Sequence, residues 1–250
     1  MDMIEDKLRK SYGKDEIQDS LFETFSTKDA VVWIDPLDGT SDFVKGTYSA
    51  VTVLIGLSIK DKSRIGIVHS PYSVEDPSVG KTIFGTGEQG AFKLVYNKDM
   101  SEAEQLARVP EYLEPFDHDE EPEPDHRIKV AASLSHFSAT IKEVIETIEP
   151  METVRLGGAG NKCCNIALGN VDTYMHPSPG LKYWDLCANE SLIKAMGGIS
   201  YNLYSERLSS PLSGNRKIYG LILAKNPPMY NMVIQRLGPL LQKIVQTAKL

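Results

Sequence analysis

The sequence predicts an α+β fold of two lobes, with an antiparallel sheet in the first lobe and a mixed sheet in the second. Apolar runs separated by short polar turns occur in pairs in the first half, which is typical of antiparallel strands. The second half alternates strand and helix patterns, which is typical of a sheet covered by helices. An acidic, proline-rich stretch separates the halves. We therefore expect lobes over residues 1–98 and 128–250, joined by a solvated linker or surface loop over 99–127.

The first half is expected to form one buried strand followed by two hairpins. Residues 1–29 are polar and mixed in charge, so we expect them to be weakly helical or frayed. The apolar run 30–34 predicts a buried strand that ends at Pro36 and turns at Gly39. Further strands are expected at 51–59, 65–69, 82–84 and 91–96, paired as hairpins around "KDKSR" and "GTGEQG".

The second half is expected to alternate strands and helices. Apolar residues at Ile141, Val144, Ile145 and Ile148 recur at helical spacing, and Gly197 marks the end of a later helix. The expected strands lie at 129–133, 154–156, 171–175, 199–203 and 218–224. The expected helices lie at 138–149, 161–168 and 184–196, followed by a last amphipathic helix that is kinked at Pro239.

The composition excludes several classes of protein. The chain has 250 residues, of which 41% are hydrophobic, and this is enough for a sizeable core. No apolar run approaches the ~20 residues of a membrane helix, and the first residues show no signal-peptide pattern. Three cysteines form an odd, sparse set that favours a reducing compartment, so we expect a cytoplasmic protein.

The charge is distributed unevenly along the chain. Residues 99–125 hold eleven acidic residues and one arginine, a charge of −10 within a total of −7, which leaves +3 for the remainder. No stripe of lysine and arginine indicates a nucleic-acid track, whereas a small anionic ligand suits the basic remainder. The sequence does not indicate an oligomeric state.

The stretch "WIDPLDGTSDF" places Asp35, Asp38 and Asp42 within eight residues. One interpretation is a plain turn, because aspartate side chains hydrogen-bond nearby backbone groups. The other is a metal site, because two carboxylates aimed at one point repel each other unless a cation separates them. Oxygen ligands favour Mg²⁺ or Mn²⁺ over Zn²⁺, and the turn exposes the Leu37 carbonyl and the Thr40 hydroxyl. Asp42, beyond the turn, is expected to be solvated or structural.

Three further features are site candidates, each with a plainer interpretation. Asp185 lies at the start of a predicted helix, where an acidic residue commonly serves as a cap. The turn "GGAGNK" can bring backbone N–H groups and Lys162 to a phosphate, although many such turns are merely tight. His136 in "SLSHFS" is the weakest candidate, and its alternative is an exposed or helix-capping histidine.

Taken together, "WIDPLDGTSDFVKG" and "WDLCANESLIKAMGG" resemble the two signature regions of the inositol monophosphatase superfamily. Its members are metal-dependent, lithium-sensitive phosphomonoesterases with a layered α/β sandwich of the sugar-phosphatase type. The stretches "GIVHSPY", "GGAGNK" and "SPGLKYWDLCANE" are most similar to its 3'(2'),5'-bisphosphate nucleotidase branch. Inositol polyphosphate 1-phosphatases share much of this pattern and are the nearest alternative.

The resemblance implies hydrolysis of 3'-phosphoadenosine 5'-phosphate to AMP and phosphate, with two or more Mg²⁺ ions and with neither a nucleic-acid nor a membrane partner. The catalytic residues that it implies are Thr40 and Asp38. The metal ligands that it implies are Asp35, the Leu37 carbonyl, Asp38 and Asp185. The substrate-binding residues that it implies are Ser133, His136, Gly158 and Lys162.

The sequence departs from this family upstream of Asp35. The family has an aspartate on an early helix, which pairs with the threonine, and a glutamate in a G-E-E type turn, which bridges metals. Only 34 residues precede Asp35, and none matches that pattern. We therefore expect the family's N-terminal helices to be absent and one face of the first sheet to be exposed. A truncated product, or a catalytically weakened or inactive nucleotide-binding relative, is the resulting alternative.

Overall fold

The computed structural model describes residues 25–123, 128–134, 137–206, 208 and 218–248. Sheet A consists of β1 (Ala30–Asp38), β2 (Thr52–Ile59), β3 (Lys62–Ser70), β4 (Val79–Thr86), β5 (Gly90–Asn97) and β6 (Glu111–Leu113). These six strands are antiparallel and lie in chain order. Sheet B consists of β7 (Lys129–Ser133), β8 (Glu152–Leu156), β9 (Thr173–Pro179), β10 (Ile199–Tyr201) and β11 (Tyr219–Ala224). Its strand order is β10-β11-β9-β7-β8, with the last three strands parallel to one another.

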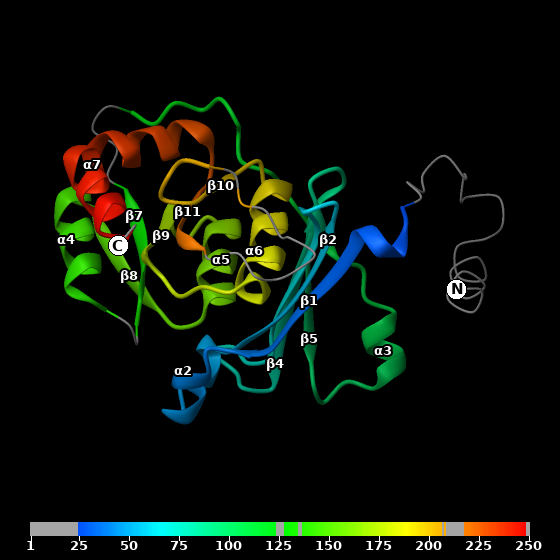
Figure 1. Ribbon diagram of the computed structural model, residues 1–250. Coiled ribbons are helices and arrows are strands. Elements are labelled where there is room, and N and C mark those ends of the chain that lie inside the picture. The colour runs from blue at the N-terminus through cyan, green and yellow to red at the C-terminus, as the bar shows by residue number, and fades with distance from the viewer. Residues whose placement is uncertain (1–24, 124–127, 135–136, 207, 209–217, 249–250) are drawn as a thin grey trace.

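Four longer helices complete a layered structure. They are α4 (Ala139–Ile148), α5 (Ala159–Ala167), α6 (Tyr183–Ala195) and α7 (Pro227–Ala248). The short elements are α2 (Thr40–Val44), α3 (Glu102–Leu106) and the 3₁₀ helices η2 (Thr27–Asp29) and η3 (Tyr48–Ala50). Helices α5 and α6 lie between the two sheets, whereas α4 and α7 cover the far face of sheet B (Figure 1). This arrangement confirms the predicted α+β fold. No helix in the described ranges is long and apolar enough to cross a membrane.

Two turns differ from their predicted form. Strand β1 does not end at Pro36 but continues to Asp38, with a register shift against β2. Because β1 is an edge strand of sheet A, the missing N–H of a proline is tolerated there. The β2–β3 hairpin turns on two residues, Lys60 and Asp61, whose φ angles are 48° and 63°. Positive φ at both central residues is typical of a tight type I′ turn, so the turn is shorter than "KDKSR".

The predicted kink in the last helix is confirmed. Helix α7 contains Gly238, whose φ of 43° and ψ of −123° are not helical, directly before Pro239. The ring of Pro239 cannot accommodate the preceding residue in helical conformation, and glycine adopts the required alternative.

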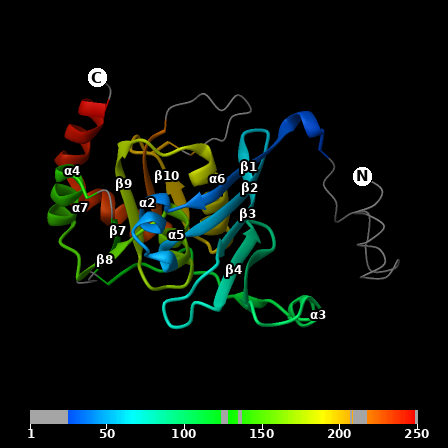
Figure 2. The same cartoon turned by 90° about the horizontal axis from the view of Figure 1, so that it is seen from below.

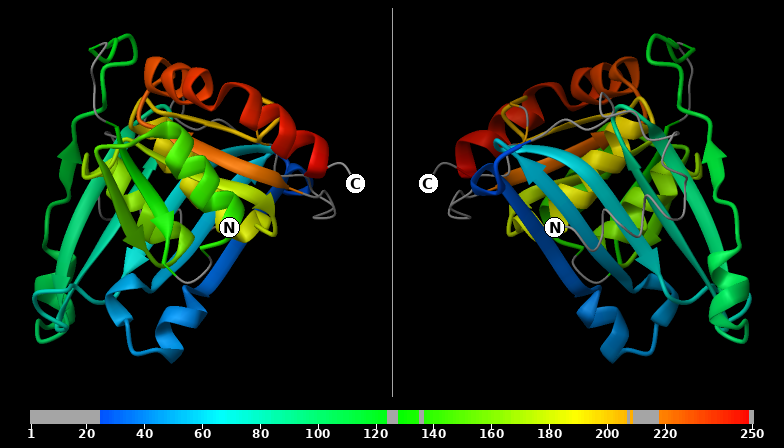
Figure 3. Two further views of the ribbon diagram at one scale, coloured as in Figure 1. Left: turned by 90° about the vertical axis from the view of Figure 1, so that its left-hand side faces the viewer. Right: turned by 90° about the vertical axis from the view of Figure 1, so that its right-hand side faces the viewer.

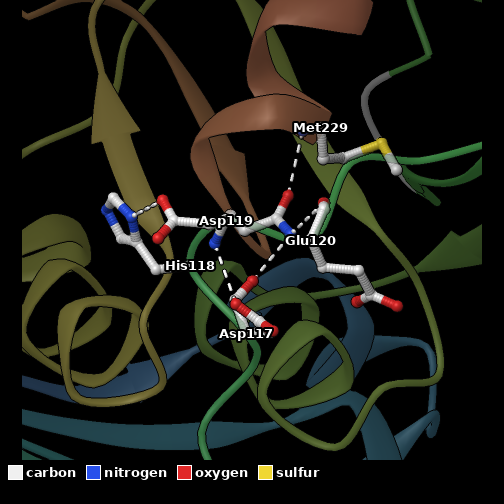
Figure 4. Close-up of polar contacts among 6 residues, drawn as sticks. Asp117, His118, Asp119, Glu120 and Met229 are labelled. Atoms are coloured by element: carbon white, nitrogen blue, oxygen red, sulfur yellow. Dashed lines mark hydrogen bonds and ion pairs between the residues drawn. The ribbon is translucent and has the colours of Figure 1, made fainter.

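The acidic segment is more structured than the solvated linker or surface loop expected for 99–127. It contains α3 and β6, and β6 extends sheet A. Further along, the Asn226 side chain donates to the carbonyls of Asp117 and Glu120 at 3.0 and 3.1 Å. The same side chain accepts from the Met229 N–H at 2.9 Å and so caps α7 (Figure 4). Backbone carbonyls of the segment thus fix it to the start of α7. The lobe boundaries at 98 and 128 stay a prediction.

Sheet A has a row of three glycines, two of which, Gly56 and Gly66, pack against α6. Gly56, Gly66 and Gly85 are direct neighbours on β2, β3 and β4. A Cβ on Gly56 would lie 2.6 Å from the Ala188 nitrogen, and a Cβ on Gly66 would lie 2.2 Å from the Ala188 oxygen. The backbone of α6 therefore approaches the sheet as closely as main-chain atoms allow, and this contact fixes the position of Asp185 one turn earlier.

The substitution Gly66→Ala is expected to lower the free energy of unfolding by about 1–3 kcal/mol, as overpacking of a core does. The two nearest atoms that the new methyl group would meet belong to the Ala188 backbone of α6 and cannot rotate away. Urea denaturation would measure the loss. The control is Gly87→Ala in the β4–β5 turn, where a Cβ meets nothing within 4 Å. Equal losses in the two variants would contradict close packing of α6.

The outer face of sheet A carries exposed apolar side chains. Val32 and Ile34 are 58% and 55% exposed, and Ile55 and Ile65 are 37% and 38% exposed. Figure 3 (right) views the sheet from this side, with α6 behind the strands. The expected exposure of this face holds for these four side chains. The predictions about the N-terminal helices and a frayed start fall mainly on residues 1–24, which lie outside the described residues.

Candidate functional site

A cavity of about 400 Å³ lies where β1, α2, α5, β9 and α6 meet. Figure 2 shows α2 next to α5 at this end of the layers. Eight predicted site residues line the cavity: Asp35, Leu37, Asp38, Thr40, Ser133, Gly158, Lys162 and Asp185. The ninth, His136, lies outside the described residues. The fold therefore brings together side chains from segments that are far apart in the sequence.

Three carboxylates form the polar centre of this cavity. One oxygen from each of Asp35, Asp38 and Asp185 lies within 4.8 Å of the other two. Asp38 is buried, whereas the other two are partly exposed. Like charges repel strongly at this separation when water is excluded, so the cluster needs a proton or a cation among its oxygens.

The Asp38 carboxylate joins sheet A to the start of α5. It accepts hydrogen bonds from the N–H groups of Ala159 and Gly160 at 3.0 and 2.8 Å. The Thr52 hydroxyl on the neighbouring strand β2 donates a third bond at 2.7 Å. An anion at a helix N-terminus is favourable, and here the anion is part of the protein. Two of the N–H groups that "GGAGNK" was expected to offer to a phosphate are therefore occupied by Asp38.

Close contact with Asp38 also requires a glycine at residue 158. Gly158 has a φ of +65°, which side chains rarely adopt. A Cβ at this position would lie 2.8 Å from an Asp38 carboxylate oxygen and 2.7 Å from the Ala50 carbonyl. Any side chain at residue 158 would push the carboxylate away from the helix terminus.

The end of β1 orients the first carboxylate. The Leu37 N–H donates to Asp35 at 3.0 Å. The Thr40 hydroxyl at the start of α2 donates to the Leu37 carbonyl at 2.9 Å. The predicted ligand carbonyl and the predicted catalytic hydroxyl therefore contact each other directly, beside Asp35.

The electrostatics of the cluster fit a divalent cation. Burial, together with the charges of Asp38 and Asp35, raises the pKa of Asp185 to about 7, although the Lys182 N–H donates to this carboxylate. Burial likewise raises the pKa of Asp35, whose carboxyl group hydrogen-bonds that of Asp185. Without a cation, the cluster thus retains a proton near neutral pH. A set of anionic oxygen ligands suits Mg²⁺ or Mn²⁺, either of which would take the place of that proton.

Lys162 supplies a buried positive charge to the cavity. It is 4% exposed, and its ammonium group donates to the Gly158 carbonyl at 2.6 Å. It also lies 5.0 Å from the centroid of the Tyr174 ring. Burial lowers the pKa of Lys162 to about 8, whereas nearby carboxylates, Asp38 foremost, act in the opposite direction. The side chain is therefore mostly protonated at neutral pH and can bind an anion.

Ser133 ends β7 in the cavity wall, and Arg155 on the adjacent strand β8 holds it. The guanidinium donates from Nε to the Ser133 carbonyl at 2.9 Å and from Nη2 to the Leu134 carbonyl at 3.2 Å. Its central carbon also lies 3.7 Å from the centroid of the Phe137 ring. Arg155 therefore fixes the chain where it leaves sheet B, and nothing in the sequence pattern marked it.

Several other cavity residues were also missed. Asp42 was expected to be solvated or structural, but it is only 2% exposed, so the solvated alternative is wrong. It lies against Gly157, where a Cβ would be 2.2 Å from its carboxylate oxygen. Tyr174, His176 and Trp184 line the cavity as well. The only available signal for these three was their position beside "SPGLKYWD".

Comparison with known proteins places the chain in a family. The model of the inositol monophosphatase family matches residues 2–234. The chain is 32% identical over 193 residues to mouse (Mus musculus) 3'(2'),5'-bisphosphate nucleotidase 1, which covers 76% of this chain and 55% of the mouse protein. The human (Homo sapiens) protein of the same name is 32% identical over 183 residues, covering 72% and 52%. The chain thus spans about half the length of these curated relatives.

Solved structures agree at the level of the fold. A crystal structure of inositol monophosphatase-II from Staphylococcus aureus superposes with a TM-score of 0.64 at 19% identity, covering 99% of this chain and 83% of that one. The structure of SaIMPase-II with 2'AMP bound gives the same TM-score and identity, covering 99% and 85%. Since the family model extends over most of the sequence, the chain belongs to the inositol monophosphatase family.

Proposed function

We propose that the chain is a Mg²⁺-dependent phosphomonoesterase that removes the 3'-phosphate of 3'-phosphoadenosine 5'-phosphate and leaves AMP. The observation that carries this proposal is the cluster of Asp35, Asp38 and Asp185 in one cavity with the cation Lys162. The substrate is supported by the mouse and human relatives, which are named 3'(2'),5'-bisphosphate nucleotidase 1. SaIMPase-II has a solved structure with 2'AMP bound, which supports an adenosine phosphate as the kind of substrate.

The acidic cluster needs cations before a phosphate can enter. Mg²⁺ held by Asp35, the Leu37 carbonyl, Asp38 and Asp185 would polarise the phosphate oxygens and lower the pKa of a bound water. The three carboxylates and a phosphate dianion together carry about five negative charges, and Lys162 balances only one of them. This imbalance supports two or more ions rather than one.

The chain's own residues hold the reacting groups. The Thr40 hydroxyl donates its hydrogen bond to the Leu37 carbonyl, so its oxygen lone pairs can accept a hydrogen bond from a water in the cavity. That bond would orient the water towards the phosphorus and take part in removal of its proton. On the opposite wall, Lys162 would bind the phosphate that is not cleaved, and Ser133 and Gly158 would contact the nucleoside. Asp38 fixes the position of β1 relative to α5 through its hydrogen bonds to the start of that helix.

Phosphate release from 3'-phosphoadenosine 5'-phosphate tests the proposal. We expect release that requires Mg²⁺, decreases with Li⁺ and exceeds release from inositol monophosphate. The Asp35→Asn variant is the control, because it keeps the shape of the site and removes one charge from the cluster. Release no faster than in this variant would refute phosphatase activity for this chain.

Two alternatives have distinct outcomes in the same experiment. The first alternative is a weakened or inactive nucleotide-binding relative. Calorimetric binding of 3'-phosphoadenosine 5'-phosphate without turnover would support it. Faster hydrolysis of inositol monophosphate or an inositol polyphosphate 1-phosphate would instead assign the inositol phosphatase activity.

The proposed location is the cytoplasm. All three cysteines, Cys163, Cys164 and Cys187, are buried thiols. A protein that keeps its thiols reduced suits a reducing compartment. Fractionation of cells expressing the tagged chain would check this.

Arg155→Ala is expected to raise KM for the nucleotide about tenfold and to change kcat by less than about threefold. The variant loses two charge-assisted hydrogen bonds to the backbone carbonyls of Ser133 and Leu134. The free energy of one such bond corresponds to about a tenfold change in an equilibrium constant. Steady-state kinetics would measure the split between KM and kcat. Arg155→Lys keeps the positive charge but not the several N–H donors of the guanidinium, so its KM should lie between those of the wild type and Arg155→Ala. An unchanged KM would contradict a positioning role.

A further inference from the structure

A second cavity, of about 540 Å³, lies on the other side of the glycine-rich turn from the carboxylate cluster. Gly157 and Asn161 line this second cavity, whereas Gly158 and Lys162 line the first. Its remaining walls come from η3, the β3–β4 connection, β4 and the end of β8. None of the residues predicted from the sequence as metal ligands or catalytic groups lines it.

The second cavity is positively charged. Lys81 and Arg155 line it, against a single acidic side chain, Glu75. Within the described part of the chain, the Lys81 side chain takes part in no ion pair or hydrogen bond. Its ammonium group acts electrostatically on the Cys164 thiol, but burial raises the pKa of Cys164 to about 12, so that thiol is neutral. The partly buried Lys81 ammonium group therefore forms no ion pair with a described residue, and Glu75 is the one acidic side chain that lines the same cavity.

An oriented amide adds a neutral donor beside this charge. The Asn165 side chain donates to the Asn161 carbonyl at 2.8 Å and to its side-chain oxygen at 3.2 Å. The Asn170 side chain in turn donates to the Asn165 side-chain oxygen at 3.0 Å. These bonds fix which end of Asn161 is the acceptor, so its NH₂ group remains available as a donor. All three asparagines line the cavity.

We propose that this second cavity binds a phosphate group, free or as part of a phosphomonoester, through Lys81, Arg155 and Asn161. Two cations and an amide donor around one space are the usual means of holding a phosphate dianion. The volume exceeds what one phosphate fills, which leaves room for a small carrier group. The proposal does not depend on the reaction at the carboxylate cluster, because a backbone turn separates the two cavities.

Calorimetry on the metal-stripped protein with inorganic phosphate isolates this site. Without divalent cations the net negative charge of the carboxylate cluster disfavours phosphate in the first cavity, and the variant at Lys81 assigns the measured binding to the second. We expect Lys81→Gln to weaken binding about tenfold, as loss of a charged hydrogen bond does. Lys62→Gln removes the same charge from an exposed position on β3 and should bind like the wild type. Absence of binding to the wild type at millimolar phosphate, or equal affinity of the two variants, would overturn the proposal.

Chemical labelling tests the same site without a variant. Pyridoxal 5'-phosphate carries a phosphate and an aldehyde, and its aldehyde condenses with a lysine amine with loss of water. Borohydride then reduces the imine to a stable amine that peptide mapping locates. We expect Lys81 to be labelled more than Lys62, and inorganic phosphate to suppress the label at Lys81. Labelling of Lys81 that phosphate does not suppress would count against the site.

Discussion

Replacing Asp38 by alanine is expected to reduce stability and activity together. The variant leaves three donors without their acceptor: the N–H groups of Ala159 and Gly160 and the Thr52 hydroxyl. Bonds to a charged group contribute about 1.5–3 kcal/mol each, and removal of one partner from a buried charged network costs about 3–5 kcal/mol in total. We therefore expect the free energy of unfolding to fall by that amount. Phosphate release should fall more than about a hundredfold, because the cluster loses a carboxylate.

The matched variant is Asp35→Ala, which removes a carboxylate from the same cluster. Among its described bonds, Asp35 accepts from the Leu37 N–H of its own turn and shares a hydrogen bond with Asp185. Its removal relieves repulsion in the metal-free protein, so we expect stability close to that of the wild type with a similar loss of activity. Urea unfolding of the metal-stripped proteins and phosphate release with Mg²⁺ make the comparison. If both variants unfold at the same urea concentration, Asp38 does not link the strand to the helix.

The sequence could predict the parts of the site that are local. Asp35, Asp38 and Thr40 fall within one turn, so their spacing alone aims their side chains at one region. Asp185 could be placed in the first turn of a predicted helix, but only the family resemblance named it as a metal ligand. The sequence could also predict the sheets and the longer helices, because turns and apolar periods mark them in short windows.

Contacts between distant segments could not be predicted in this way. Thr52 looks like any buried polar residue of an alternating strand, and its bond to Asp38 depends on the β1–β2 register. The role of Arg155 depends on the pairing of β7 with β8. The expectation that Asp42 could be solvated was wrong because Gly157, more than a hundred residues away, lies against its side chain and buries it.

One helix terminus shows how the two kinds of information combine. The sequence correctly indicated that "GGAGNK" starts a helix whose N–H groups suit an anion. It could not show that Asp38 already occupies the first of those groups. Lys162 then supplies most of the positive charge that remains for a ligand in this cavity. The position of Lys162 depends on Asp38 remaining in place. We therefore expect substitution of Asp38 to affect both stability and ligand binding, which its position in the motif alone does not imply.

Replacing Asp185 by asparagine is expected to stabilise the metal-free protein at pH 8 by up to about 4 kcal/mol. The pKa of Asp185 is raised to about 7 from an ordinary value of 3.8, so between these values the folded chain binds a proton that the unfolded chain does not. The stability of the wild type therefore falls as the pH rises from about 4 to about 7. A shift of about three units corresponds to about 4 kcal/mol. Asparagine keeps an oxygen for the Lys182 N–H and does not titrate, so near pH 4 we expect the two proteins to be similar.

Urea unfolding of the metal-stripped proteins between pH 4 and pH 8 measures this difference. Asp99→Asn, at an exposed position on the loop after β5, is the matched control and should follow the wild-type pH profile. Adding Mg²⁺ at pH 8 should stabilise the wild type, because the ion replaces the lost proton, and should stabilise Asp185→Asn much less. Asp185→Asn should also be less active than the wild type. Together these results would show that the same carboxylate lowers the stability of the metal-free protein and binds the cation. Parallel pH profiles for the wild type and Asp185→Asn would mean that the carboxylates are not coupled, and the site would then have no reason to prefer a cation over a proton.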